Sequence, residues 1–98
     1  MHQGILWTPI AESDLDDILY YIAREDNRPE KAIDILHEIQ STVQQRVLKE
    51  IPGHRHPVAP EGWLYFKFKR WLIFYQPIPS GIEVMRVVDG VRDLPATL

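Results

Sequence analysis

The spacing of apolar residues changes along the chain, and this change limits the fold more than any other feature. In residues 8–48 apolar side chains recur every three or four positions, which is the period of an amphipathic helix. In residues 63–88 they alternate or form short continuous runs, which is typical of strands. The apolar run at residues 4–7 is long enough for one more strand. We therefore expect the element order β-α-α-β-β-β.

Two helices are predicted in the first half. Thr8 and Pro9 form a start signal, because a hydroxyl can cap a helix and proline suits its first position. Residues 24–28 interrupt the pattern, and Pro29 begins a second helix that Pro52 ends. Helices joined by so few residues lie antiparallel, as a hairpin. The apolar stripes are Ala11, Leu15, Ile18, Leu19 and Ile22 in the first helix and Ala32, Leu36, Ile39, Val43 and Val47 in the second, broadened by Ile33, Ile35 and Leu48.

Three strands are predicted in the last third, over residues 63–69, 71–76 and 82–88. The first alternates between an apolar face and a face that carries Trp63, Tyr65, Lys67 and Lys69. The second is apolar on both faces, as a central strand would be. Helices with one apolar stripe pack on such strands as two layers. The expected fold is α+β, a helical hairpin packed on a mainly antiparallel sheet, in a single domain of residues 1–98.

Composition excludes several classes of protein. The 98 residues include no cysteine, which rules out disulfide scaffolds and cysteine nucleophiles and fits a cytoplasmic protein. The chain lacks a signal peptide pattern and an apolar run long enough to cross a membrane. The net charge is −3, but residues 51–98 hold six Lys or Arg against four Asp or Glu. A polyanion would therefore meet the second half of the chain.

The polar motifs give little support for a metal, a cofactor or a hydrolase. His54-Arg55-His56 resembles a pair of metal ligands, but no third ligand follows at a recognisable spacing, so a polar loop is the favoured interpretation. Asp14, Asp16 and Asp17 are favoured by the helix dipole without any cation. No serine or threonine stands beside an identifiable base, and there is no glycine-rich phosphate loop. We expect no metal site and no cofactor.

Arg86 lies between Val84 and Val88 in a strand that is otherwise apolar. A cation on a buried face needs a partner. One interpretation is structural, with an ion pair to Glu83, Asp89 or Asp93, or with the side-chain stem packed and its charge in water. The other is an anion site for phosphate or carboxylate. The pattern alone leaves both open.

Several segments together resemble the RelE/ParE superfamily of bacterial toxins from type II toxin–antitoxin systems, and the ParE-like branch most closely. They follow the family's order over nearly the whole chain: WTPIAESDLDDILYYIA, PEKAIDIL, PGHRHP, WLIFYQP and GIEVMRVVDGVRDLPATL. The specific feature is the co-occurrence of LIFY-x-P with GIE-x-x-RVV-x-G-x-RDL. The resemblance implies a small cytosolic toxin that is held inactive by an antitoxin encoded with it. RelE-like members cut messenger RNA on the ribosome with basic and aromatic residues, whereas ParE-like members poison DNA gyrase and have no established catalytic residues.

This chain departs from the family pattern at positions that bear on RNA cleavage. The resemblance implies arginines near Leu64 and at Gln76 and a histidine at Asp89, while Arg86 and Arg92 match. A nuclease needs such groups near the phosphate. The family's glycine-containing turn is also replaced, by Lys69-Arg70. Either the hairpin is longer, or a non-glycine residue takes a positive φ at a cost of about 1 kcal/mol.

Three hypotheses follow. The leading one is a ParE-like toxin that inhibits DNA gyrase by binding, without catalytic residues of its own. The alternative is a ribosome-dependent mRNA interferase that uses Arg86, Lys67, Lys69 and Tyr75. The third is a toxin fold that has become a harmless binder. All three predict an exposed aromatic face that binds an acidic antitoxin segment, as a helix in a groove plus an added strand, with these contact residues: Trp63, Tyr65, Lys67, Lys69, Arg70, Trp71, Tyr75, Arg86 and Arg92.

Overall fold

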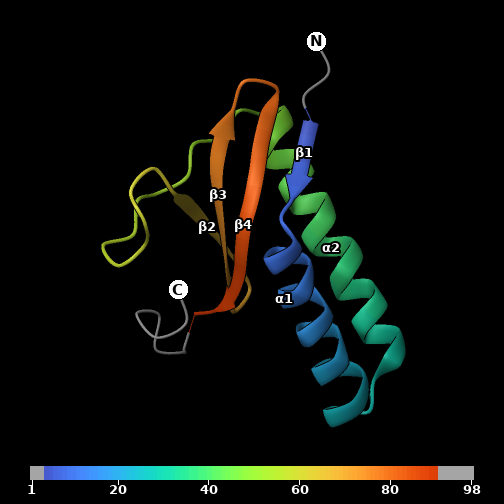
Figure 1. Ribbon diagram of the computed structural model, residues 1–98. Helices are drawn as coiled ribbons and strands as arrows, with labels where there is room; N and C mark the ends of the chain where they lie inside the picture. Colours follow the sequence, from blue (N-terminus) through green and yellow to red (C-terminus); the bar gives the residue numbers. More distant parts are fainter. Residues whose placement is uncertain (1–3, 91–98) are drawn as a thin grey trace.

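The computed structural model describes residues 4–90 and has the predicted element order (Figure 1). The elements are β1 (Gly4–Trp7), α1 (Pro9–Tyr20), the π-helical turn η1 (Tyr21–Glu25), α2 (Pro29–Leu48), β2 (Leu64–Phe68), β3 (Trp71–Ile78) and β4 (Gly81–Asp89). The turn η1 continues α1 directly, so the first helix extends into the segment where the sequence pattern breaks. The predicted α+β fold, a helical hairpin on a sheet, is confirmed.

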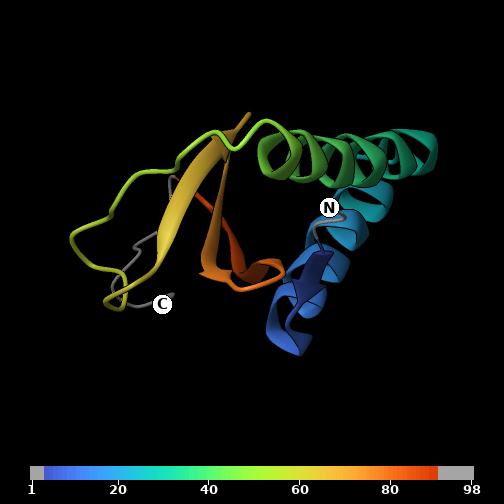
Figure 2. The same cartoon turned by 90° about the horizontal axis from the view of Figure 1, so that it is seen from above.

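The four strands form one mixed sheet in the order β1-β4-β3-β2. Strand β1 is parallel to β4, and the other neighbours are antiparallel. Strand β3 is therefore central, as its apolar sequence predicted. Both helices lie on one side of the sheet, and the segment after α2 runs along the other side (Figure 2).

The start signals of both helices are confirmed, but the predicted end of the second helix is wrong. The Thr8 side chain accepts a hydrogen bond from the N–H of Ala11 at 3.0 Å, and Pro9 is the first residue of α1. Helix α2 begins at Pro29 but ends at Leu48, ahead of the expected stop at Pro52. The backbone reverses earlier because Glu50 takes a φ of +52°.

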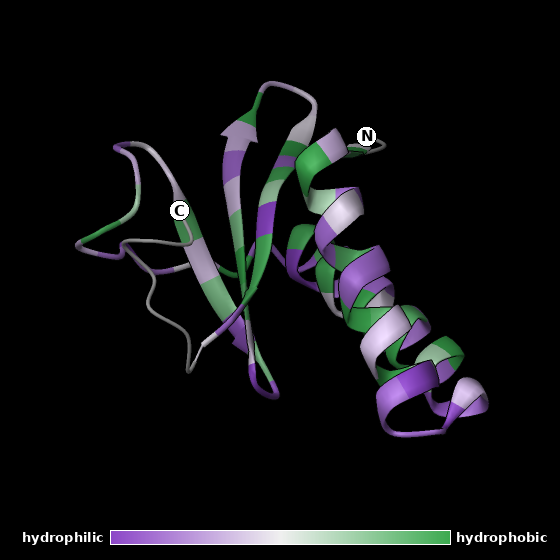
Figure 3. Cartoon of the chain, turned by 60° about the horizontal axis from the view of Figure 1, so that its bottom comes forward, coloured by the Kyte–Doolittle hydropathy of each residue, from purple (hydrophilic) through white to green (hydrophobic). Residues whose placement is uncertain are grey.

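The main core fills the space between the helices and the sheet. Its completely buried side chains include Ala11, Ile39 and Val43 from the helices and Ile73 and Val84 from the sheet. In the helical hairpin, hydrophilic positions lie on the outer helix surfaces and on the connection between the helices (Figure 3).

The predicted width of the α2 stripe needs correction at its edges. Ile33 and Leu48 are 57% and 70% exposed, so they do not broaden the buried stripe. Ile35 is buried, whereas Leu36 is only partly buried. The helical period places residue 35 directly between the buried positions 32 and 39, and turns its neighbours away from the sheet.

Strand β4 contains a bulge beside Arg86. Phe74 is opposite Arg86 and Tyr75 is opposite Val84, so Met85 is an extra residue without a partner across the ladder. The bulge shifts the alternation by one position. As a result Val84 and Val87 both pack in the core under the helices, and Arg86 shares the opposite face with Phe74. The sequence left open which face of the sheet carries Arg86, and the bulge decides it.

Candidate functional site

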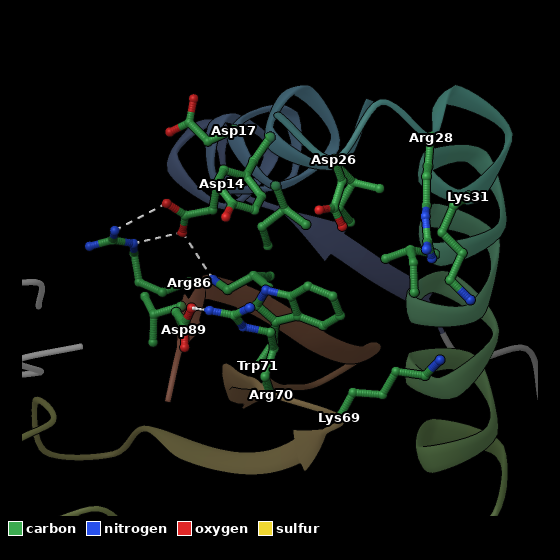
Figure 4. A pocket seen from close by; sticks show the side chains of 16 residues that line it. Asp14, Asp17, Asp26, Arg28, Lys31, Lys69, Arg70, Trp71, Arg86 and Asp89 are labelled. Carbon is green, nitrogen blue, oxygen red and sulfur yellow. Dashed lines mark hydrogen bonds and ion pairs between the residues drawn. The ribbon is translucent and has the colours of Figure 1, made fainter. Parts of the chain in front are cut away.

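Arg86 is held to helix α1 by a bidentate ion pair with Asp14 (Figure 4). Its Nε donates to Oδ2 at 2.8 Å, and its Nη2 donates to Oδ1 at 3.1 Å. The two side chains are 19% and 14% exposed, so solvent screens the pair only in part. These hydrogen bonds raise the pKa of the Arg86 guanidinium, although burial acts in the opposite direction. Of the two interpretations left open, the ion pair describes this structure, with a partner from another element.

Two of the carboxylates that the sequence suggested as partners of Arg86, Glu83 and Asp89, bind other side chains in the structure. Glu83 accepts a hydrogen bond from Nε2 of Gln76 at 2.9 Å. Asp89 forms an ion pair with Arg70, and this hydrogen bond raises the pKa of the Arg70 guanidinium. Asp93 lies outside the described residues. Because Asp14 and Arg86 are 72 residues apart, sequence spacing carried no signal for their contact.

Asp14 also completes the edge of β4 where β1 ends. Thr8 donates from its backbone N–H to Val84 and from its hydroxyl to Met85, each at 3.1 Å. Asp14 Oδ2 then accepts the N–H of Val87 at 2.9 Å. A side chain thus satisfies a backbone group that a longer β1 would otherwise have paired. The carboxylate therefore acts as a link between α1 and β4, not only as a favourable charge near a helix start.

The other acidic and histidine candidates do not assemble into a metal site in residues 4–90. Asp16 and Asp17 are exposed on α1. No group of three or more His, Asp or Glu side chains in this part of the chain is arranged to hold a metal ion.

The predicted aromatic residues do not share one exposed face, so this expectation is wrong. Trp71 and Tyr75 are 8% and 7% exposed and pack in the main core under the helices. Trp63 and Tyr65 lie on the other face of the sheet, where they pack around Phe74. The split follows from strand alternation, because β3 is buried on both faces. Roles of these side chains in binding stay predictions.

The segment before β2 packs against this second face through His56 and Ala59. His54 and Tyr65 exchange two backbone hydrogen bonds, both at 2.8 Å. The ring of His56 stands edge-on to Tyr65 and Phe74, with centroid distances of 5.4 Å and 5.8 Å. Gly53 allows the start of this segment to lie close to β2 and β3, because a Cβ there would lie 2.8 Å from the carbonyl oxygen of Tyr65 and 2.6 Å from the hydroxyl of Tyr75. The histidines thus lie in the predicted loop, where His54 is exposed and His56 packs on the sheet.

The predicted cations lie in different places. Lys67 is exposed on β2, and Arg92 lies outside the described residues. Lys69 pairs with Glu38 of α2 at 3.2 Å, at a half-exposed site where such a pair contributes under about 1 kcal/mol. The turn between β2 and β3 has two residues, and Lys69 takes a φ of +53°. The alternative of a non-glycine residue with positive φ is therefore confirmed.

A groove of about 650 Å³ lies between the far end of the helical hairpin and the ends of β3 and β4 (Figure 4). It brings together four of the predicted residues, Lys69, Arg70, Trp71 and Arg86. It also contains Arg28 and Lys31 at the start of α2, which sequence reasoning missed. Their spacing of three residues places them on one helix face, which was the available signal.

A family model of the ParE toxin of type II toxin–antitoxin systems, parDE, matches residues 5–94. The chain belongs to the ParE toxin family. The match covers nearly all of the chain, so the toxin class inferred from the sequence segments is confirmed. No curated protein matches this ParE family member significantly in sequence.

The structural comparison supports the same fold. This ParE family member is similar to a solved structure described as the chromosomal ParDE TA system from P. aeruginosa, with a TM-score of 0.70. The two chains share 22% identity, and the match covers 89% of this chain and 95% of that one. No helix within residues 4–90 is long and apolar enough to cross a membrane.

Proposed function

We propose that this toxin acts in the cytoplasm by binding DNA gyrase, and that a cognate antitoxin neutralises it. The proposal rests on the ParE family membership together with the state of Arg86. The Asp14 carboxylate accepts hydrogen bonds from Nε and Nη2 of Arg86, and it also accepts the backbone N–H of Val87 in β4. A phosphate that used Arg86 would have to compete with this link. A mode of action through protein binding needs no such exchange.

The positions around Arg86 also disfavour RNA cleavage. Leu64 is packed against the main core, and Gln76 donates to the carboxylate of Glu83. Asp89 contributes a further negative charge beside Arg70. Stabilising the charge on a scissile phosphate requires fixed donors and cations that point at it. Here Glu83 and Asp89 instead place carboxylates along β4.

The four residues of the nuclease alternative do not line a common groove. Lys69 and Arg86 line the large groove, whereas Tyr75 lines a smaller one of about 320 Å³ near the end of α2. Lys67 projects from β2 opposite Leu72, which packs on the face away from the helices. General acid–base catalysis requires groups within hydrogen-bond reach of the same reacting atoms. The arrangement therefore fits the gyrase proposal better.

Expression in a bacterial host without antitoxin distinguishes the two modes. We expect growth to stop, chromosomal DNA breaks to accumulate, and messenger RNAs to stay intact when their 5′ ends are mapped by primer extension. Tyr75→Phe should be as toxic as the wild type, because it retains the ring in the core and removes only the hydroxyl. If the wild type produced new cuts in translated messages and Tyr75→Phe were not toxic, the interferase would be favoured. Unimpaired growth with folded wild-type protein would favour the harmless binder.

A further inference from the structure

The two outer edges of the sheet differ in how their backbone groups are paired. At the β2 edge, His54 exchanges two backbone hydrogen bonds with Tyr65, both at 2.8 Å, and the exposed Lys67 adds a charge. Pairing and charge of this kind keep further strands from adding to an edge. Where β4 continues past the end of β1, the carboxylate of Asp14 accepts the N–H of Val87. Both of these positions are therefore protected.

Strand β1 lacks these protections within residues 4–90. It is the outermost strand on its side of the sheet (Figure 1), and its sequence GILW contains no charge and no proline. The N–H groups of Gly4 and Thr8 bond toward the β4 side, at 2.6 Å and 3.1 Å. Alternate residues of a strand direct their backbone groups to opposite sides, so those of Ile5 and Trp7 point away from β4. No other segment of residues 4–90 bonds to them.

The side chains beside this edge are apolar or uncharged. Both neighbours of Leu6 in β1 pack against the main core, so alternation turns Leu6 to the opposite face, where it is 55% exposed. On the helix side, a groove of about 600 Å³ lies between β1 and α2, lined in part by Gln40, Gln44 and Leu48. None of the described residues that line it is charged. Leu48 is 70% exposed. Apolar surface next to unpaired backbone groups is typical of a site for strand pairing.

We propose that β1 pairs with β1 of a second copy of this chain, in antiparallel orientation about a two-fold axis at Leu6. Ile5 of one copy then lies opposite Trp7 of the other, and each such pair exchanges two backbone hydrogen bonds. Leu6 lies opposite its own counterpart, so the two exposed side chains cover each other. The sheet becomes continuous across both copies. This contact uses neither Arg86 nor the large groove, so it is independent of the gyrase proposal.

The chemistry at this edge favours a second copy as the occupant. A two-fold axis perpendicular to the sheet keeps the helices of both copies on one side, so α2 meets α2 and Leu48 packs on its counterpart. Gln40 and Gln44 carry amides that both donate and accept, so they can bond to copies of themselves. The net charge of −3 does not oppose the contact locally, because the residues that line the groove are uncharged. A partner recognised by its charge would find no opposite charge there.

A cysteine at the axis tests the register of this pairing. The chain has no cysteine, so one substitution gives one thiol per copy. In Leu6→Cys the two thiols belong to a non-hydrogen-bonded pair, whose Cα separation of about 4.5 Å is within the range of a disulfide. With oxidised glutathione, we expect the full chain to form a covalent dimer on non-reducing gels. Ile33→Cys is the control, because Ile33 is 57% exposed on α2, and it should remain mostly monomeric.

Sedimentation equilibrium measures the dimer without a cross-link. The wild-type chain should dimerise at micromolar concentrations. Leu6→Lys should weaken dimerisation by about tenfold or more, because it opposes like charges at the axis. It should keep the wild-type circular dichroism spectrum, since Leu6 lies outside the core, and Ile33→Lys should leave the dimer intact. A wild-type chain that stays monomeric throughout the micromolar range, or equal cross-linking of Leu6→Cys and Ile33→Cys, would overturn the second copy as the occupant of this edge.

Discussion

Gly81→Ala is expected to remove most of the stability of the folded state. Gly81 is opposite Gly4 where β1 joins β4, and its φ is +150°. A Cβ at this position would lie 1.8 Å from the carbonyl oxygen of Gly4 and within 3 Å of two more backbone atoms of that residue. Backbone atoms in a ladder cannot move aside as a flexible side chain can, so β1 would have to leave the sheet. We expect a loss of about 4 kcal/mol or more, which is most of the stability of a typical small domain.

Gly62→Ala is the matched control for this prediction. Gly62 also has a positive φ, of +90°, but a Cβ there would meet no atom within 4 Å. Only the conformational cost remains, which is about 1–2 kcal/mol. Urea unfolding followed by tryptophan fluorescence would measure both variants. If Gly81→Ala were no less stable than Gly62→Ala, the described pairing of β1 with β4 would be wrong.

The second large effect is expected for Asp14→Ala, with a loss of about 3 kcal/mol. This substitution removes the Asp14 carboxylate that binds the Arg86 guanidinium and accepts the N–H of Val87, at a site that is mostly shielded from water. Asp14→Asn should be milder, because an amide oxygen can still accept one of these hydrogen bonds. Asp16→Ala is the control, since Asp16 is exposed two residues away on the same helix, and it should cost less than about 0.5 kcal/mol.

A double-mutant cycle isolates the contribution of the ion pair. Asp14→Ala, Arg86→Ala and the double variant would be unfolded in urea under identical conditions. We expect a coupling free energy of about 1–3 kcal/mol, because the residues are in direct contact. Additive losses in the double variant would show that Arg86 and Asp14 do not stabilise each other in solution.

Local signals predicted the elements of this fold well. Thr8 and Pro9 mark the start of α1, and the alternation around Phe66 predicts which side chains of β2 face the core. For the turn at Lys69 the sequence left two possibilities, a longer hairpin or a non-glycine residue with a positive φ, because a short hairpin turn restricts the backbone. Each of these features depends on residues close together in the chain.

The site was harder to predict, because it depends on register and on distant contacts. The extra residue Met85 shifts Arg86 to the face that carries Phe74, and an apolar run contains no sequence signal for a bulge. In the sequence, the partner of Arg86, Asp14, is only one of several acidic residues on a helix. Trp71 has a sequence environment similar to that of Trp63, yet the helices cover one and the segment before β2 packs on the other. Tertiary packing decides these points.

We propose that this toxin acts on gyrase through binding. The most direct test adds purified, folded toxin to gyrase with relaxed plasmid and ATP and follows supercoiling and DNA cleavage on gels. We expect supercoiling to fall and cleaved plasmid to accumulate as toxin is added. We expect the protein encoded by the reading frame adjacent to the toxin gene to reverse both effects. Unchanged supercoiling with folded toxin in excess over gyrase, while the same preparation cuts ribosome-bound messenger RNA, would contradict the claim.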